Sequence, residues 1–195
     1  MISAMASGYV PLNQRGSSSL EGTAVLRSQL SLLWPKYNIE QIFDAGSHDA
    51  AWQVQTIAKE VQYSAGEINP ELVALAQQNN PGLDVIEFDI TKDSLPDVDL
   101  LFVRDLTIHL SHDQKSKAVQ NWLSSGIDYL LISHNLSTLH NQEIDLSGSL
   151  FPFADVNWNM PPWNWPAPLE ILWEIGPNGR SMSLWHRSQI LEVNK

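Results

Sequence analysis

Carboxylates and imidazoles follow directly on apolar runs of the sequence, in short polar segments. Residues 44–49 (DAGSHD) follow the first such run, and Glu67 ends the second run, 21 residues after Gly46. In sheets that bind nucleosides, a carboxylate near this offset accepts two hydrogen bonds side by side from the hydroxyl pair of a ribose. The spacing of Gly46 and Glu67 therefore predicts a site for the sugar of a nucleoside.

Three further apolar runs end in residues of the same chemical types. The third run ends at Asp89, the fourth ends in Arg104-Asp105 and is followed by His109, and the fifth leads into His134. Carboxylates and imidazoles accept hydrogen bonds and take up protons, so these positions are candidates for ligand binding and proton transfer. The structural alternative is a carboxylate that caps a neighbouring helix, or a histidine that serves only as a hydrogen-bond donor.

The histidines also raise the alternative of a metal-dependent hydrolase. Its ligands would be His109, His112, Asp113 and His134. His109 and His112 lie on either side of an expected helix start, and the sequence has no H-E-x-x-H motif. We therefore predict no metal site.

The segments around these positions alternate between strand and helix patterns. Apolar residues recur at helical intervals in some segments, and other segments are short, continuous apolar runs. The expected strands are 39–45, 61–68, 83–90, 98–103 and 129–133, and the expected helices are 18–34, 51–60, 69–79 and 111–124. Such alternation predicts a parallel sheet covered by helices on both faces, with binding sites at the carboxyl ends of its strands.

Sequence signals for helix starts support three of the helices. Ser18 with Glu21, and Ser111 with Gln114, have the spacing of a capping box. Asn69 is an expected N-cap, followed by a proline at the first helical position and a glutamate in the first turn. These signals predict where the three helices begin.

The last third of the chain departs from this alternation. Residues 150–168 contain five prolines and three tryptophans, which is too proline-rich for a helix or a central strand. Residues 169–175 and 182–186 are expected strands joined by the Gly-Pro-Asn-Gly turn at 176–179. The predicted fold class is α/β, a doubly wound and mostly parallel sheet with a C-terminal antiparallel hairpin at its edge.

Composition sets limits on domain organisation and on partners. The chain has 195 residues, a net charge of -11 and 43% hydrophobic residues, which suit one compact domain. Residues 1–19 are rich in polar and small residues and are the expected flexible arm, and residues 20–195 are the expected single domain. Binding of nucleic acid needs clustered lysine and arginine, so the acidic balance argues against it.

Cysteines and targeting signals are both missing from the sequence. The absence of cysteine excludes a disulfide framework, a thiolate metal site and a cysteine nucleophile. The start, MISAMASGYV, lacks the basic segment and long apolar core of a signal peptide, and no apolar run approaches the roughly 20 residues that span a bilayer. We therefore expect a cytoplasmic protein without a membrane partner. The sequence specifies no oligomeric state.

Five segments, taken in order, carry a resemblance to a known family. They are GSSSLEGTAVLR at 16–27, DITKDSLP at 89–96, RDLTIHL at 104–110, PPWNWP at 161–166 and SLW at 183–185. With these segments the chain resembles the Rossmann-like (class I) S-adenosylmethionine-dependent methyltransferases, and within them a little-characterised bacterial branch. The resemblance implies a Rossmann-like fold, S-adenosylmethionine as the cofactor and methyl transfer as the reaction.

The resemblance also implies roles for the residues at the first three strand ends. Asp44 and Gly46 would belong to the loop under the methionine part of the cofactor. Glu67 would hold the ribose. Asp89 and the backbone of Ile90 would bind the adenine.

The residues that would face the transferred methyl group are Arg104, Asp105 and His109. A hydroxyl or protonated amine needs a base near that group, and His109 is the first candidate because imidazole titrates close to neutral pH. Asp105 would orient His109 or bind the acceptor. The expected acceptor side also contains His134 as the reserve base and the rings of Trp163 and Trp165, whose flat faces suit a sugar or another ring.

One position departs from the family's pattern. Where the family has a glycine or another small residue in the first loop, this chain has His48. The backbone there turns tightly, often with a positive φ, and histidine adopts that conformation at some cost. Two outcomes stay open: a methyltransferase for a small-molecule or carbohydrate-type acceptor, or a noncatalytic relative that binds a nucleoside-like ligand or a partner protein.

Overall fold

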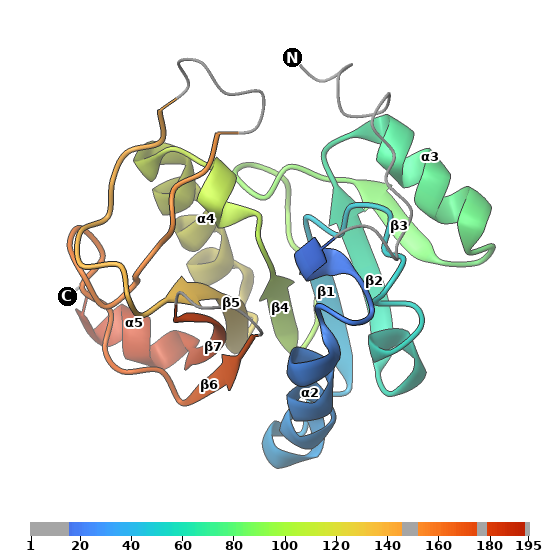
Figure 1. The fold of residues 1–195 in the computed structure, drawn as a ribbon, viewed down its shortest axis with the longest axis horizontal. Helices are drawn as coiled ribbons and strands as arrows, with labels where there is room; N and C mark the ends of the chain where they lie inside the picture. Colours follow the sequence, from blue (N-terminus) through green and yellow to red (C-terminus); the bar gives the residue numbers. More distant parts are fainter. Residues whose placement is uncertain (1–15, 146–151, 175–178, 194–195) are drawn as a thin grey trace.

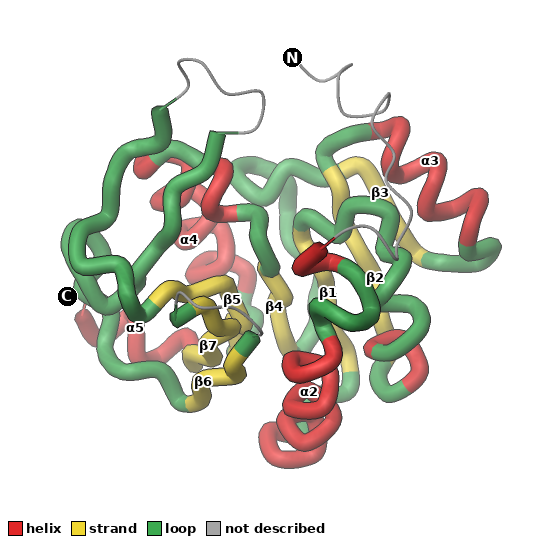
Figure 2. The backbone as a smooth tube through the Cα atoms, in the orientation of Figure 1, coloured by secondary structure: helices red, strands yellow, loops and turns green. Residues whose placement is uncertain are grey.

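A seven-stranded sheet forms the centre of the computed structural model, which describes residues 16–145, 152–174 and 179–193. The strand order in this part of the chain is β3-β2-β1-β4-β5-β7-β6, as Figures 1 and 2 show. The strands are β1 (Gln41–Ala45), β2 (Gln62–Glu67), β3 (Asp84–Glu87), β4 (Leu100–Val103), β5 (Tyr129–Asn135), β6 (Glu170–Trp173) and β7 (Arg180–His186).

The directions of the strands match the predicted fold class. β1 to β5 are parallel to their neighbours, β7 is antiparallel to β5, and β6 is antiparallel to β7. The mostly parallel sheet with a C-terminal antiparallel hairpin is therefore confirmed. β5 extends beyond its expected end at Ser133, because His134 and Asn135 pair with Ser181 and Arg180 of β7.

Helices cover both faces of this sheet. They are α2 (Ala24–Tyr37), α3 (Pro70–Asn79), α4 (His112–Ser125) and α5 (Arg187–Val193), with short 3-10 helices η2 (Gly16–Ser18), η3 (Ile57–Lys59) and η4 (Thr107–His109). Successive residues of β1 point to opposite faces: Ile42 belongs to the core that contains Leu26 of α2, and Phe43 belongs to the core that contains Trp122 of α4. None of the helices in the described ranges has the length and apolar character needed to cross a membrane.

Two of the three predicted helix starts are confirmed. The Asn69 side chain accepts a hydrogen bond from the Glu71 N–H at 2.9 Å, and Pro70 is the first helical residue. Ser111 and Gln114 form both hydrogen bonds of a capping box. These local bonds satisfy N–H groups that a helix start leaves without partners.

The prediction that the first helix spans 18–34 is wrong at both ends. Ser18 belongs to η2, and α2 begins at Ala24. The hydroxyl of Ser19 donates to one neighbouring carbonyl and accepts from one neighbouring amide, which closes a turn before the helix. The helix continues past Pro35, and the left-handed Asn38 ends it by donating its N–H to a carbonyl of the last turn.

The predicted helix at 51–60 is also wrong, because this segment consists of turns and the short η3. The carbonyl of Gln53 accepts from the N–H groups of both Thr56 and Ala58, at 3.1 Å each, which interrupts the regular helical ladder. The buried Gln53 side chain donates to Asp44 of β1. A tertiary contact therefore overrides the local pattern.

The expected arm lies only partly within the described residues. Residues 1–15 fall outside them, and residues 16–18 form η2. Ser19, which follows, is buried. Of the expected turn at 176–179, the structure describes only Gly179, with a φ of 66°.

Candidate functional site

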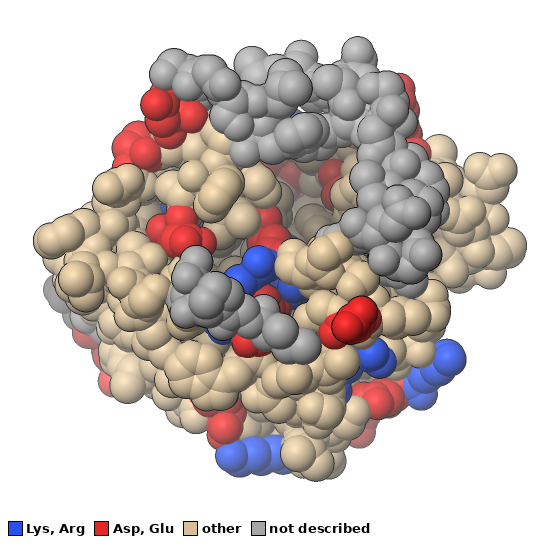
Figure 3. All heavy atoms as spheres, viewed as in Figure 1, with Lys and Arg blue, Asp and Glu red and all other residues tan. Residues whose placement is uncertain are grey.

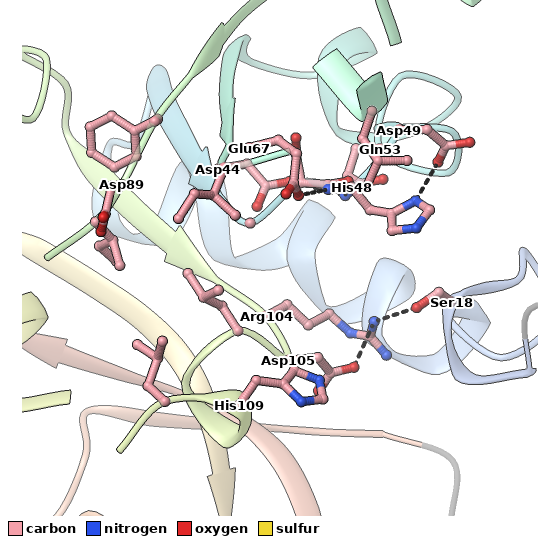
Figure 4. A pocket seen from close by; sticks show the side chains of 18 of the residues that line it. Ser18, Asp44, His48, Asp49, Gln53, Glu67, Asp89, Arg104, Asp105 and His109 are labelled. Carbon is pink, nitrogen blue, oxygen red and sulfur yellow. Dashed lines mark hydrogen bonds and ion pairs between the residues drawn. The ribbon is translucent and has the colours of Figure 1, made fainter. Parts of the chain in front are cut away.

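A cavity of about 690 Å³ opens at the carboxyl ends of β1, β2 and β4. Figure 3 shows this face of the molecule hollowed, with acidic side-chain atoms in and around the hollow, and Figure 4 shows the cavity from close by. Parallel α/β sheets bind their ligands at this edge. The structure brings together eight predicted site residues in the lining: Asp44, Gly46, Glu67, Asp89, Ile90, Arg104, Asp105 and His109.

The loop after β1 has left-handed backbone at three alternate positions. The φ angles are 86° at Gly46, 57° at His48 and 53° at Ala50. Glycine is required at the first position, because a Cβ on Gly46 would lie 3.0 Å from the Cβ of Leu106. The other two positions carry side chains despite the cost of this conformation. Sequence reasoning missed the left-handed backbone at Ala50, because alanine gives no signal for it.

His48 leaves the cavity open. Its Nδ1 lies 3.3 Å from Oδ1 of Asp49, whose carboxylate is buried, and its own side chain is 54% exposed. The backbone N–H of His48 donates to Oε2 of Glu67 at 2.9 Å. His48 therefore lies in a tight turn, and its imidazole is part of the cavity lining.

The carboxylate of Glu67 is fixed by two backbone amides. Oε2 accepts the bond from His48, and Oε1 accepts from the N–H of Asn69 at 3.0 Å. Glu67 is 9% exposed and lines the cavity at the end of β2. Each carboxylate oxygen accepts more than one hydrogen bond, so both can also bind a ligand.

Asp44 lies at the end of β1 and is 1% exposed. Its Oδ2 accepts from the hydroxyl of Tyr63 at 2.7 Å and from Nε2 of Gln53 at 3.0 Å. Burial raises the pKa of Asp44 to about 6, although both hydrogen bonds and the charge of Arg104 act in the opposite direction. The carboxylate is therefore ionised at pH 7.

Asp89 follows β3 on the side of the cavity opposite His48 (Figure 4), and Ile90 also lines the cavity. Oδ1 of Asp89 accepts from the N–H of Thr91 at 2.9 Å and from its hydroxyl at 2.6 Å. Burial favours a higher pKa for Asp89, but these bonds and the charge of Lys92 outweigh it and lower the pKa. The carbonyl of Ile90 accepts from Asn121 at 2.9 Å, which ties this wall of the cavity to α4.

Arg104 joins three separate segments of the chain. Its Nε donates to Glu174 at 2.6 Å, after β6, and its guanidinium donates to the carbonyl of Ser17 at 2.9 Å. It also pairs with Asp105 at 3.2 Å and lies 5.9 Å from the ring centre of Trp52. Burial opposes the charge of Arg104, but the carboxylates around it keep its pKa raised. Arg104 therefore holds the cavity wall in place.

Asp105 takes part in the same ionic cluster. It pairs with both Arg104 and Arg180, and Arg180 in turn pairs with Glu174 at 2.8 Å. Its backbone is left-handed, with a φ of 59°, and its N–H donates to the hydroxyl of Ser133 at 2.8 Å. These partners position the Asp105 carboxylate, and none of them is His109.

His109 is exposed at the rim of the cavity. Its Nδ1 donates to the carbonyl of Pro152 at 2.8 Å. A carbonyl is only an acceptor, so Nδ1 carries a proton and Nε2 is the ring nitrogen left for another partner. The segment that supplies this carbonyl is held in place by the N–H of Ala154, which donates to the carbonyl of Ile108 at 2.8 Å.

The structure does not bring His134 to the cavity. Its side chain is 1% exposed, and its Nδ1 accepts from the N–H of Trp158 at 3.3 Å. Burial lowers the pKa of His134 to about 4, so the ring is neutral at pH 7. Pairing of β5 with β7 keeps this residue inside the sheet.

Trp163 and Trp165 also lie away from the cavity lining. Trp165 is buried and stacks on Trp158, with ring centres 4.5 Å apart. Trp163 packs against Trp158 at 4.8 Å and against His112 at 5.1 Å. The tryptophan-rich loop therefore extends the apolar core next to α4.

The four residues considered as metal ligands have separate surroundings. His112 pairs with Glu143, and Asp113 pairs with Lys117. Within residues 16–145, 152–174 and 179–193, no three histidine or acidic side chains are grouped so that they could hold a metal ion.

Comparisons with solved structures place this fold among the methyltransferases. Magnesium protoporphyrin IX methyltransferase from Synechocystis PCC 6803, solved with bound S-adenosylmethionine, is 14% identical with a TM-score of 0.61, covering 92% of this chain and 86% of that one. Human N-acetylserotonin methyltransferase, in complex with the same compound, is 15% identical with a TM-score of 0.61. The match covers 89% of this chain and 55% of the human enzyme. The sugar N-methyltransferase KedS8 from Streptoalloteichus is 13% identical with a TM-score of 0.50, covering 63% and 53%.

These comparisons show the Rossmann-like methyltransferase fold. The chain spans about half the length of the human enzyme and of the sugar N-methyltransferase. No protein-family model matches the chain, and no curated protein matches its sequence.

Proposed function

We propose that this protein is an S-adenosylmethionine-dependent methyltransferase that acts on a small-molecule or carbohydrate-type acceptor. The observation that carries this proposal is the Glu67 carboxylate, which lines the cavity at the end of β2 and is held by two backbone N–H groups. Its remaining lone pairs suit the two hydroxyls of a ribose. Fold relatives that bind S-adenosylmethionine support the choice of cofactor.

Other polar atoms of the lining fit the same cofactor. Oγ of Ser47, in the loop after β1, is buried and has no hydrogen-bond partner within the described part of the chain. Buried polar atoms are normally satisfied, so a polar ligand would supply the missing partner. Asp44 would bind the ammonium of the methionine part, and Asp89 with the Ile90 backbone would bind the adenine.

The chain's own contribution to catalysis is positioning and removal of a proton. When bound, S-adenosylmethionine would supply a methyl group on a positively charged sulfur, and the sulfur would keep the electron pair of the bond that breaks. The acceptor's lone pair forms the new bond to carbon, which requires alignment more than acid catalysis. Nε2 of His109 would take the proton that a hydroxyl or ammonium acceptor releases.

The charge of the lining supports an acceptor without phosphate or carboxylate groups. Arg104 is the lining's one arginine, and its charge is balanced by Asp105 and Glu174. The lining contains five carboxylates: Asp44, Asp49, Glu67, Asp89 and Asp105. An anionic acceptor would be repelled there, whereas a neutral or cationic one would not.

Calorimetry with S-adenosylhomocysteine tests the cofactor assignment. We expect wild-type protein to bind it and Glu67→Gln to bind about tenfold more weakly or worse, because the variant loses a charge-assisted bond. Glu87→Gln, an exposed neighbour on β3, is the matched control and should retain wild-type affinity. Absence of binding to wild-type protein, or equal affinity of the Glu67 variant, would contradict the proposal.

Transfer of a labelled methyl group to a panel of amines, phenols and amino sugars tests the reaction itself. Binding of the cofactor without transfer to any acceptor of the panel would instead support the noncatalytic relative that binds a nucleoside-like ligand.

A further inference from the structure

Both hydrogen bonds to Asp44 converge on one of its two oxygens. Tyr63 and Gln53 donate to Oδ2, at 2.7 and 3.0 Å. No residue of the described ranges donates to Oδ1. Asp44 lines the cavity, so Oδ1 is the oxygen left for a ligand.

The two donors reach Asp44 from different elements. Tyr63 lies in β2, pairs with Ile42 in register and is 8% exposed. It does not line the cavity, so any effect that it has on a ligand passes through Asp44. Gln53 is 5% exposed, and its Nε2 donates a second hydrogen bond, at 3.2 Å, to the carbonyl of Ser47 in the loop after β1.

We propose that Tyr63 and Gln53 are positioning residues that hold Asp44 ionised, with Oδ1 turned into the cavity to bind the ammonium group of the cofactor's amino-acid part. This inference rests on the proposed function and adds to it. It assigns the pair to recognition of the amino-acid part alone, whereas Glu67 recognises the adenosine part.

The electrostatics of Asp44 agree with this role. Burial raises the pKa of its carboxyl group to about 6, and the charge of Glu67 acts in the same direction. The hydrogen bonds from Tyr63 and Gln53 and the charge of Arg104 oppose this rise. Removal of the Tyr63 hydroxyl should therefore raise the pKa of Asp44 further and reduce the ionised fraction near neutral pH.

The test compares two ligands that share the adenosine and the sulfur. S-adenosylhomocysteine has the amino-acid part, and 5′-methylthioadenosine lacks it. At pH 7 we expect Tyr63→Phe and Gln53→Met to weaken binding of S-adenosylhomocysteine about tenfold, because a charge-assisted contact is lost, and to change binding of 5′-methylthioadenosine less than about twofold. Tyr37→Phe loses a comparable hydroxyl-to-carboxylate bond, to Glu170 at 2.6 Å, away from the cavity. It should leave both affinities unchanged.

The ratio of the affinities for S-adenosylhomocysteine and 5′-methylthioadenosine is then measured between pH 5 and 8. If Tyr63 and Gln53 only stabilised the fold, their substitution would not change this ratio. In wild-type protein the preference for S-adenosylhomocysteine should fall toward acid with a midpoint near pH 6, and Tyr63→Phe should move that midpoint upward. A variant that weakens both ligands equally, or leaves the ratio and its pH dependence unchanged, overturns the positioning role. If wild-type protein binds neither ligand, the proposed function fails as well; if it binds both, only the inference is at stake.

Discussion

At the scale of single residues, His109 owes its tautomer to a backbone carbonyl, since Nδ1 donates to Pro152. We expect His109→Gln to keep the affinity for S-adenosylhomocysteine and to lower the turnover number about 100-fold, because general-base catalysis contributes at least that much. His112→Gln is the control, because His112 does not line the cavity. Steady-state kinetics with an acceptor found in the panel would check both, and full turnover in the His109 variant would remove it from the mechanism.

The positions of Asp44 and Glu67 at the sheet edge could be predicted from the sequence, and those of His134 and Trp165 could not. Asp44 and Glu67 end strands that the alternation identifies, and parallel strands bring such ends to one edge. His134 also ends a strand, but its burial follows from pairing with β7, about 50 residues later. Trp165 is buried through aromatic stacking that no local pattern specifies. Sequence spacing therefore locates a residue on the sheet edge but does not determine which core it enters.

At the scale of elements, the loop after β1 forms part of the wall of the cavity. His48 has a φ of 57°, a conformation that costs about 1 kcal/mol or more for residues with a Cβ. We expect His48→Gly to be about 1 kcal/mol more stable than His48→Ala, because both lose the imidazole and only glycine relieves the backbone. Chemical denaturation of the two variants measures this difference. Equal stabilities would show that the loop adopts another conformation in solution.

Local bonds explain which elements could be predicted. The starts of α3 and α4 depend on hydrogen bonds between residues two or three positions apart, at Asn69 and Ser111, so the sequence contains their signal. The segment 51–60 has a helical pattern but follows a contact between Gln53 and Asp44, which comes from the neighbouring strand. The spacing of apolar residues along a segment does not reveal a contact of that kind with another element. The same contact joins two residues of the cavity lining, Gln53 and Asp44, so it both interrupts the expected helix and contributes to the candidate site.

At the scale of the whole molecule, two buried titratable groups, Asp44 and His134, have opposing effects on stability. Asp44 lies in the cavity, and His134 lies on β5 among the tryptophans. The folded pKa of His134, about 4, is below its unfolded value, so its contribution to stability is lost as the pH falls through that window. The folded pKa of Asp44, about 6, is above its unfolded value, so its contribution increases as the pH falls. Between about pH 4 and 6 the two contributions therefore change in opposite directions.

Removal of either group should therefore change the slope of the free energy of unfolding against pH in a direction that can be stated in advance. Each group changes the free energy of unfolding by up to about 1.4 kcal/mol per pH unit in that window. Relative to wild type, His134→Gln should become less stable as the pH rises from 4 to 6, and Asp44→Asn should become more stable. Urea denaturation at several pH values measures both slopes, and the differences from wild type remove the background titration of the other acidic groups. Variant profiles that run parallel to that of the wild type would mean that one or both side chains reach solvent, because burial is the main cause of the shifted pKa values of both groups.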